Sequence, residues 1–169
     1  NEANTINALT TGVVTATISS TAIADLDDLI GTGNAYTITV GNAVVTAAAL
    51  NTVDASTTVS VNATAVTTIT GTAADVIAAY TANAAGTITG LGNEAVTITD
   101  NININEANTI NALTTGVVTA TIETGSVANL ISLTETGNAY AFTVNDVSLD
   151  AGALITLNSK TTGVVTVQA

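Results

Sequence analysis

Short stretches in which apolar residues alternate with Thr recur along the whole chain. In Val14–Ile18, Tyr36–Val40 and Val118–Ile122, every second residue is apolar. Period-two alternation of this kind, rich in β-branched residues, is typical of a strand with one buried face. The pattern predicts strands at these stretches and at further ones that share it, namely 59–61, 86–89, 142–144 and 165–167, with extra strand-like pieces at 66–70 and 95–99.

The segments between these stretches are predicted to be short helices. Ser20 and Thr21 stand where they would cap a helix over 22–30, and Thr72 stands before a helix over 73–80. Each such helix has two or three turns and needs packing against the rest of the chain to persist. The other predicted helices cover 46–53, 107–113, 127–133 and 151–157.

The chain repeats itself at a fixed offset. Residues 1–18 recur unchanged at 105–122, and the same offset aligns Thr32–Tyr36 with Thr136–Tyr140. Self-similarity at a fixed period is the sequence signature of a repeat architecture. We therefore expect one long repeat unit of about four to five coils at 1–104 and a second, incomplete copy at 105–169, in one continuous solenoid without a linker.

The spacing of the predicted strands indicates how they pair. Many of them follow one another at roughly 22–24 residues, which leaves room for a crossover helix and favours parallel pairing. The expected fold is a repeat solenoid in which parallel β-strands stack along a long axis, with short helices or helical turns between them. This describes a β-solenoid or an α-β solenoid. An all-β parallel helix is the alternative. The absence of Pro suits a continuous strand ladder.

The composition excludes most catalytic and metal-binding sites. The 169 residues include no His, Cys, Pro, Met or Trp, and the formal net charge is -12 with Lys160 as the one basic side chain. Without His or Cys there is no imidazole general base, no thiol nucleophile and no zinc site of the usual ligand types. We therefore expect no enzyme activity, and the lack of basic residues argues against nucleic acid as a partner. The longest uncharged stretch, Leu29–Val53, is broken by Gly and Asn, so no membrane insertion is expected.

The runs ALTTGVVTATI and TGNAYTITV carry a family resemblance. They resemble the Thr-, Ala- and Asn-rich repeats of giant secreted and cell-surface proteins of cyanobacteria, including proteins associated with surface layers and swimming motility. The resemblance implies a bacterial protein that lies outside the cell or on its surface. It supplies no catalytic residue.

These observations together predict a structural repeat protein. We expect part of an extracellular filament, surface layer or giant cell-surface protein, in which copies associate end to end as a homopolymer. Carbohydrate or another cell-surface component is a further expected contact. The alternative is an adhesin or an ice-binding stalk that uses an outward face of Thr-x-Thr pairs, such as Thr15 with Thr17 and Thr119 with Thr121.

Two polar clusters are candidate calcium sites. Asp100, Asn101, Asn103 and Glu106 offer alternating oxygen ligands of the kind that calcium takes, although a ladder of stacked Asn side chains is the favoured interpretation. The acidic run 25–28 is interpreted as a solvated helix face, because its counterpart at 129–132 has no carboxylate. No other cofactor is expected.

Overall fold

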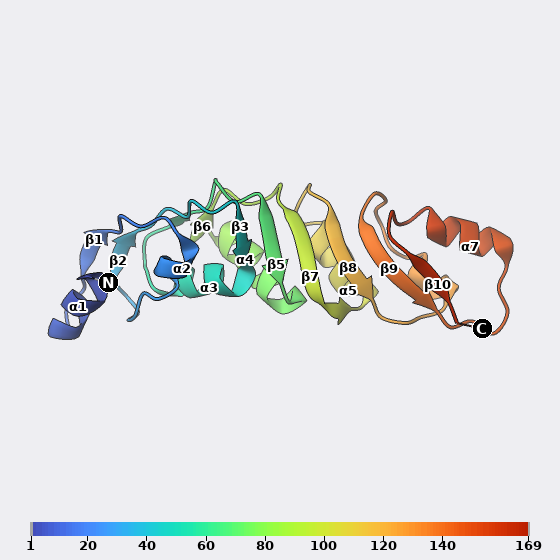
Figure 1. Ribbon diagram of the computed structural model, residues 1–169, viewed down its shortest axis with the longest axis horizontal. Coiled ribbons are helices and arrows are strands. Elements are labelled where there is room, and N and C mark those ends of the chain that lie inside the picture. Colours follow the sequence, from blue (N-terminus) through green and yellow to red (C-terminus); the bar gives the residue numbers. More distant parts are fainter. Residues whose placement is uncertain (1, 169) are drawn as a thin grey trace.

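The computed structural model describes residues 2–168 as an elongated molecule whose N- and C-terminal ends lie at opposite ends of the long axis (Figure 1). Its helices are short. They are α1 (Glu2–Leu9), α2 (Ile23–Leu26), α3 (Ala47–Ala55), α4 (Ala73–Ala85), α5 (Ile104–Asn111), α6 (Val127–Leu130) and α7 (Ala151–Asn158).

The strands are all paired in parallel. They are β1 (Thr15–Thr17), β2 (Ala35–Thr37), β3 (Val44–Thr46), β4 (Val61–Asn62), β5 (Thr68–Gly71), β6 (Ile88–Thr89), β7 (Ala95–Ile102), β8 (Val118–Ile122), β9 (Ala139–Val144) and β10 (Val165–Val167). Six of them form one sheet in the order β10-β9-β8-β7-β5-β3, while β1 pairs with β2 and β4 pairs with β6 in two smaller sheets.

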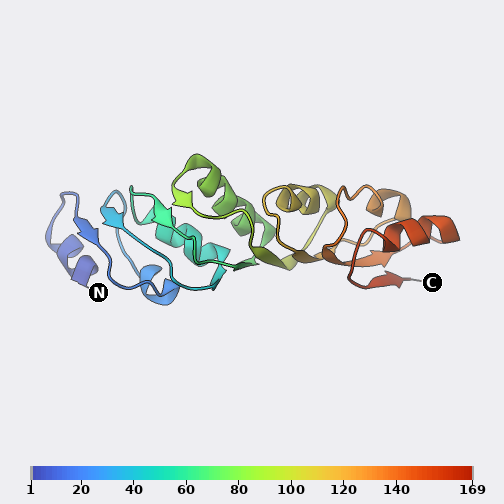
Figure 2. The ribbon, with the colours of Figure 1, turned by 90° about the horizontal axis from the view of Figure 1, so that it is seen from above.

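The alternation of apolar residues and Thr explains the layers. In β8, Val118, Ala120 and Ile122 are buried, while Thr119 and Thr121 are exposed. Helices α3 to α7 lie along the buried face of the six-stranded sheet (Figure 2). The core is therefore a single apolar layer between strands and helices. Thr forms much of the solvent-exposed face on the other side of the sheet.

Helix caps explain why the connections between strands are helical. The side chains of Thr46, Thr72 and Asn103 each accept a hydrogen bond from a backbone N–H in the first turn of α3, α4 and α5. Asn103 and Glu106 form a full capping box at α5. Such caps satisfy N–H groups that a short helix would otherwise leave unpaired, and each contributes about 1 kcal/mol.

The prediction of a repeat solenoid of stacked coils is wrong, and so is its alternative, an all-β parallel helix. Residues 2–168 form an α/β fold with a six-stranded parallel sheet and seven helices. The strands divide among three sheets, and capped helices of up to 13 residues, as in α4, fill the positions where a β-solenoid would turn. Describing the chain as a repeat β-solenoid is therefore also wrong. A division of the chain at residue 104 stays a prediction.

Candidate functional site

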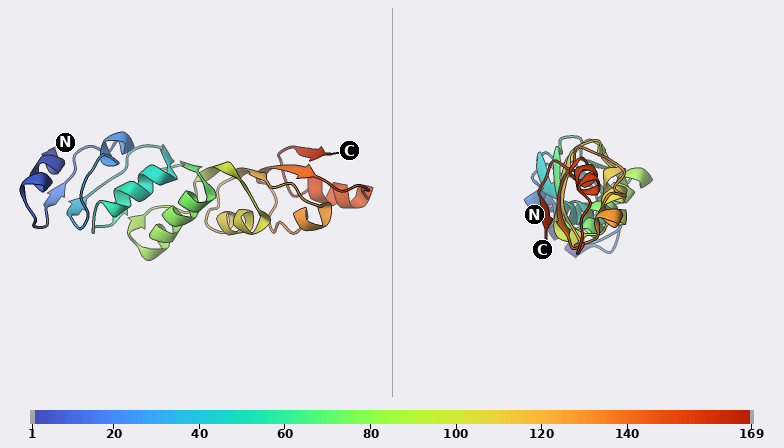
Figure 3. Two further views of the ribbon diagram at one scale, coloured as in Figure 1. Left: turned by 90° about the horizontal axis from the view of Figure 1, so that it is seen from below. Right: turned by 90° about the vertical axis from the view of Figure 1, so that its right-hand side faces the viewer.

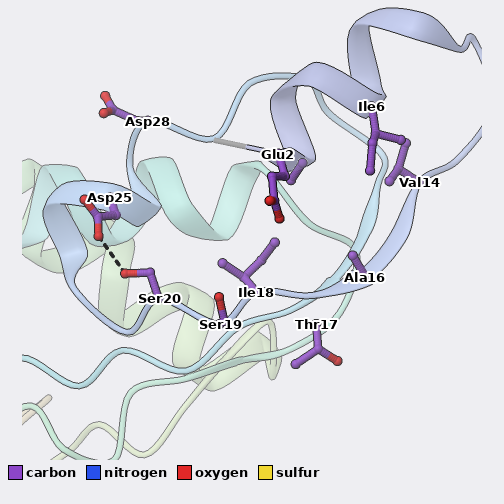
Figure 4. A pocket seen from close by; sticks show the side chains of 11 residues that line it. Glu2, Ile6, Val14, Ala16, Thr17, Ile18, Ser19, Ser20, Asp25 and Asp28 are labelled. Carbon is purple, nitrogen blue, oxygen red and sulfur yellow. Dashed lines mark hydrogen bonds between the residues drawn. The ribbon is translucent and has the colours of Figure 1, made fainter.

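The N-terminal end of the molecule carries a hollow of about 550 Å³ with both apolar and polar walls, here called the N-face. Its floor is made by Ile6, Val14, Ala16 and Ile18, and Glu2, Asp25 and Asp28 stand around it. Figure 4 shows Ile6 of α1 beside Val14, with Ile18 in the middle of the hollow. The N-face thus combines exposed apolar side chains with carboxylates around them.

The same sequence lies in the interior of the molecule 104 residues later. Ile6 is 51% exposed, whereas Ile110, its counterpart in α5, is fully buried. The difference arises because β7 pairs with β8 and α4 packs against α5, while no described element covers α1 and β1 in the same way. The part of the N-face within residues 1–18 therefore has the sequence of a segment that packs in the interior.

The C-terminal end carries a second apolar groove, of about 410 Å³, here called the C-face. It lies between α7 and β10 and is lined by Ala151, Leu154, Ile155, Asn158, Val165 and Val167. Figure 3 shows this end of the molecule facing the viewer. The counterparts of Leu154 and Val165 are Leu50 and Val61, which are fully buried because α4 packs on α3 and β6 pairs with β4.

Both faces end in strands with unpaired backbone groups. In the interior, Val96 donates its N–H to Val117 O at 2.9 Å, and Thr115 donates its N–H to Gly92 O at 2.9 Å. The corresponding groups of the N-face, Val13 O and Thr11 N–H, have no hydrogen bond within residues 2–168. An open strand edge of this kind is a template for pairing with another strand.

The structure gives the predicted calcium ligands other roles. Asp100 accepts a hydrogen bond from Ala73 N–H at the start of α4, while Asn103 and Glu106 cap α5. Asn101 lies opposite Thr121 rather than another Asn, so the Asn ladder expected here is wrong. Within residues 2–168, no group of three or more acidic side chains is placed to hold a metal ion. A calcium site at these residues stays a prediction.

The acidic run 25–28 lies beside the N-face. Asp25 belongs to α2 and accepts a hydrogen bond from Ser20 Oγ at 2.7 Å (Figure 4). Asp25 and Asp28 are exposed, while Asp27 is half-buried. These carboxylates place negative charge at the rim of the N-face.

One row of Thr crosses four strands of the six-stranded sheet. Thr46, Thr70, Thr97 and Thr119 are in register on β3, β5, β7 and β8. The row two residues before it contains Val44, Thr68 and Ala95. The Thr-x-Thr pairs therefore align into a single row of Thr across these strands rather than two.

A buried carboxyl group lies under the middle of the molecule. Glu94 is fully buried, and its Oε2 accepts hydrogen bonds from Tyr80 OH and Gly92 N–H, each at 2.8 Å. Burial raises the pKa of Tyr80 well above its ordinary value; a hydrogen bond with Thr114 opposes the shift, and Glu94 adds to it. This pair joins α4 to the segment before β7, so it stabilises the element that covers the interior counterparts of both end faces.

Comparisons with known proteins add nothing to this picture. No protein-family model, curated protein or solved structure matches the chain. Among the described residues, no helix is both long enough and apolar enough to cross a membrane.

Sequence reasoning named neither end face nor the Glu94–Tyr80 pair. No signal within residues 1–18 distinguishes the N-face, because the same 18 residues recur at 105–122. No local pattern indicates Glu94, because its partner Tyr80 lies in a separate predicted element.

Proposed function

We propose that this chain is a structural protein that associates with further copies of itself through its two end faces. The observation that carries the proposal is that Ile6 is half exposed while Ile110, in an identical sequence, is fully buried. Covering apolar surface contributes roughly 25 cal/mol per Å², so a second copy that covered Ile6 as Ile110 is covered would stabilise the association. The absence of His and Cys supports a structural role over a catalytic one.

Charge supports association at the ends rather than along the sides. The net charge of -12 makes copies repel one another, and Lys160 is the one basic side chain that could relieve the repulsion. Each end face exposes large apolar side chains, Ile6 on the N-face and Ile155 on the C-face. A location outside the cell and contact with carbohydrate or another cell-surface component stay predictions from the family resemblance.

Sedimentation velocity over two orders of magnitude in concentration tests the proposal. We expect the mean sedimentation coefficient to rise with concentration, and to rise more at high salt because salt screens repulsion between copies. Ile6→Lys should abolish the rise. Val117→Lys is the matched control, since Val117 is 50% exposed but lies away from both ends. A wild-type monomer at every concentration and salt would contradict the proposal.

Ice binding is the second candidate, and the in-register row of Thr46, Thr70, Thr97 and Thr119 favours it. Neighbouring strands lie about 4.8 Å apart, so the row presents methyl and hydroxyl groups at a regular spacing. It ranks second because Thr46 Oγ caps α3 and Thr70 Oγ donates to Val45 O, which leaves fewer hydroxyls for ice. Thermal hysteresis measures this activity directly, and its absence would remove the candidate.

A further inference from the structure

We infer that Asn62 is the acceptor of an N-linked glycan, a modification that joins a sugar to the side-chain amide nitrogen. Asn62 is the last residue of β4 and lines neither the N-face nor the C-face. The inference therefore does not depend on the proposed self-association. The co-substrate is an oligosaccharide that carries a phosphate leaving group at C1.

The sequence around Asn62 has the acceptor pattern. Asn62-Ala63-Thr64 fits Asn-x-Ser/Thr with x other than Pro, the pattern at which N-linked glycans are attached. Of the 18 Asn residues of the chain, Asn62 is the one that fits. The pattern thus selects a single position, and the fold shows how that side chain is presented.

The side chain of Asn62 points to solvent. Val61 and Ala63 on either side of it are fully buried, and alternation along the strand directs Asn62 to the opposite face, where it is exposed. Its partners in the neighbouring strands are Thr39 and Thr89, which are exposed as well. The residues beside the acceptor are therefore short and uncharged.

The two ends of the Asn62 amide have different surroundings. Oδ1 accepts hydrogen bonds from Thr64 N–H at 3.1 Å and from Thr64 Oγ1 at 2.8 Å. Within residues 2–168, Nδ2 donates no hydrogen bond. The nitrogen that a glycan would join is thus free, while the hydroxyl that the pattern requires holds the other end of the same amide.

The chain turns directly after the acceptor. Val66 N–H donates to Ala63 O at 3.0 Å, and Thr64 and Ala65 between them are exposed. Gly90 makes room for this turn, because a Cβ at that position would overlap Thr64. An exposed turn next to the acceptor leaves the site open to a transferase from the solvent side.

Glycan transfer to Asn62 is a substitution at C1 of the sugar. The bond between Nδ2 and C1 forms, and the bond between C1 and the phosphate oxygen breaks, with the electron pair leaving on the phosphate. Nδ2 gives one of its two protons to a base of the transferase. The hydrogen bonds from Thr64 to Oδ1 stay in place, so the fold need not change.

Glycan transfer to the folded chain tests the inference. The purified chain is incubated with an oligosaccharyltransferase and a lipid-linked oligosaccharide, and intact mass counts the glycans. We expect one glycan on the wild-type chain and on Thr64→Ser, and none on Thr64→Ala. Peptide N-glycosidase should then convert Asn62 to Asp, which peptide mass spectrometry locates.

The matched control places the same tripeptide where the amide is engaged. In a Thr64→Ala background, Ala85→Thr creates Asn-Ala-Thr at Asn83, whose Oδ1 accepts from Leu91 N–H at 3.1 Å and whose Nδ2 donates to Leu91 O at 3.4 Å. Ala85 is exposed, so the substitution should be tolerated. We expect transfer to Asn83 to be slower by about tenfold or more, because these hydrogen bonds must open first.

Circular dichroism first checks that each variant is folded. A folded wild-type chain that takes no glycan, while a peptide of residues 59–67 takes one, would overturn the inference. Equal rates at Asn62 and Asn83 would show that the tripeptide alone decides, and would overturn the role given to the free amide nitrogen. Neither result would change the expected sedimentation of the chain.

Discussion

Asn34 and Asn138 lie 104 residues apart and make the same two hydrogen bonds. Asn34 Oδ1 accepts from Val14 N–H at 3.0 Å, and its Nδ2 donates to Asn7 Oδ1 at 2.9 Å. Asn138 Oδ1 accepts from Val118 N–H at 2.8 Å, and its Nδ2 donates to Asn111 Oδ1 at 2.6 Å. Each Asn joins the strand that follows a helix to the helix itself, and both side chains are buried.

Replacement of either Asn by Ala should therefore destabilise the chain. Asn138→Ala leaves the buried Val118 N–H without its acceptor, which costs about 2 kcal/mol of unfolding free energy, and Asn34→Ala should cost a similar amount. Urea unfolding monitored by circular dichroism measures both. Asn93→Ala is the control, because Asn93 is exposed. Equal midpoints for Asn138→Ala and Asn93→Ala would show that this hydrogen bond contributes nothing.

Gly116 and Gly12 are the same residue in the two sequence copies but have different surroundings. A Cβ at Gly116 would overlap the Glu94 carbonyl, whereas a Cβ at Gly12 would meet only Thr10 Oγ1 at 3.4 Å. Gly116→Ala should cost about 2 kcal/mol or more, because the backbone before β7 must move. Gly12→Ala should leave the unfolding free energy of the monomer unchanged.

Although Gly12→Ala should not change the stability of the monomer, it should weaken self-association. If a second copy covers the N-face as β7 covers β8, a Cβ at Gly12 will meet its backbone, and Gly12→Ala should weaken self-association in sedimentation experiments. An unchanged association constant would show that no strand approaches Gly12 as closely as Glu94 approaches Gly116.

Two buried tyrosines should respond in opposite ways to loss of their hydroxyl groups. Tyr36 OH has no hydrogen-bond partner among the described residues, whereas Tyr80 OH donates to Glu94. Tyr36→Phe should stabilise the chain or leave it unchanged, since it removes an unpaired buried polar group. Tyr80→Phe should destabilise it by about 1–3 kcal/mol, because Glu94 loses a donor. Thermal unfolding of the two variants checks the sign of each change, and a stabilised Tyr80→Phe would contradict the role given to the pair.

Alkaline pH should weaken the fold. Burial raises the pKa of Tyr140 to about 12; a hydrogen bond with Asn138 opposes the shift, and the charge of Glu135 adds to it. An unfolded tyrosine ionises near pH 10, so above that pH the unfolded chain loses its proton first and unfolding becomes more favourable. The free energy of unfolding should therefore fall as pH rises from about 10 to about 12. Urea midpoints across this range measure the fall, and Tyr140→Phe should make it shallower. An identical slope in this variant would exclude Tyr140 as a cause.

The sequence predicted single elements better than it predicted the fold. The alternation over Val118–Ile122 is confirmed as β8, and Thr72 is confirmed as the cap of α4. Ser20 and Thr21 do not cap α2, because Ala22 holds the cap position and Asn42 Oδ1 accepts from Ile23 N–H. Asn42 lies in another segment, so local spacing could not reveal it.

The fold class depends on which elements pack against the buried face of each strand. Period-two patterning indicates a buried strand face but not whether a helix or another strand covers it. Here helices α3 to α5 cover that face and the strands divide among three sheets, one of them six-stranded, so the solenoid prediction is wrong. The exposure of the end faces depends on which elements pack against them. The sequence pattern does not reveal this, because residues 1–18 and 105–122 are identical but have different surroundings.

Electron microscopy of the purified chain at high concentration and high salt tests the central claim most directly. If copies associate through their end faces, particles should lengthen along the long axis while their width stays that of one molecule, and Ile6→Lys should leave single molecules. Single particles of wild-type protein at every concentration, or assemblies that grow in width, would contradict it.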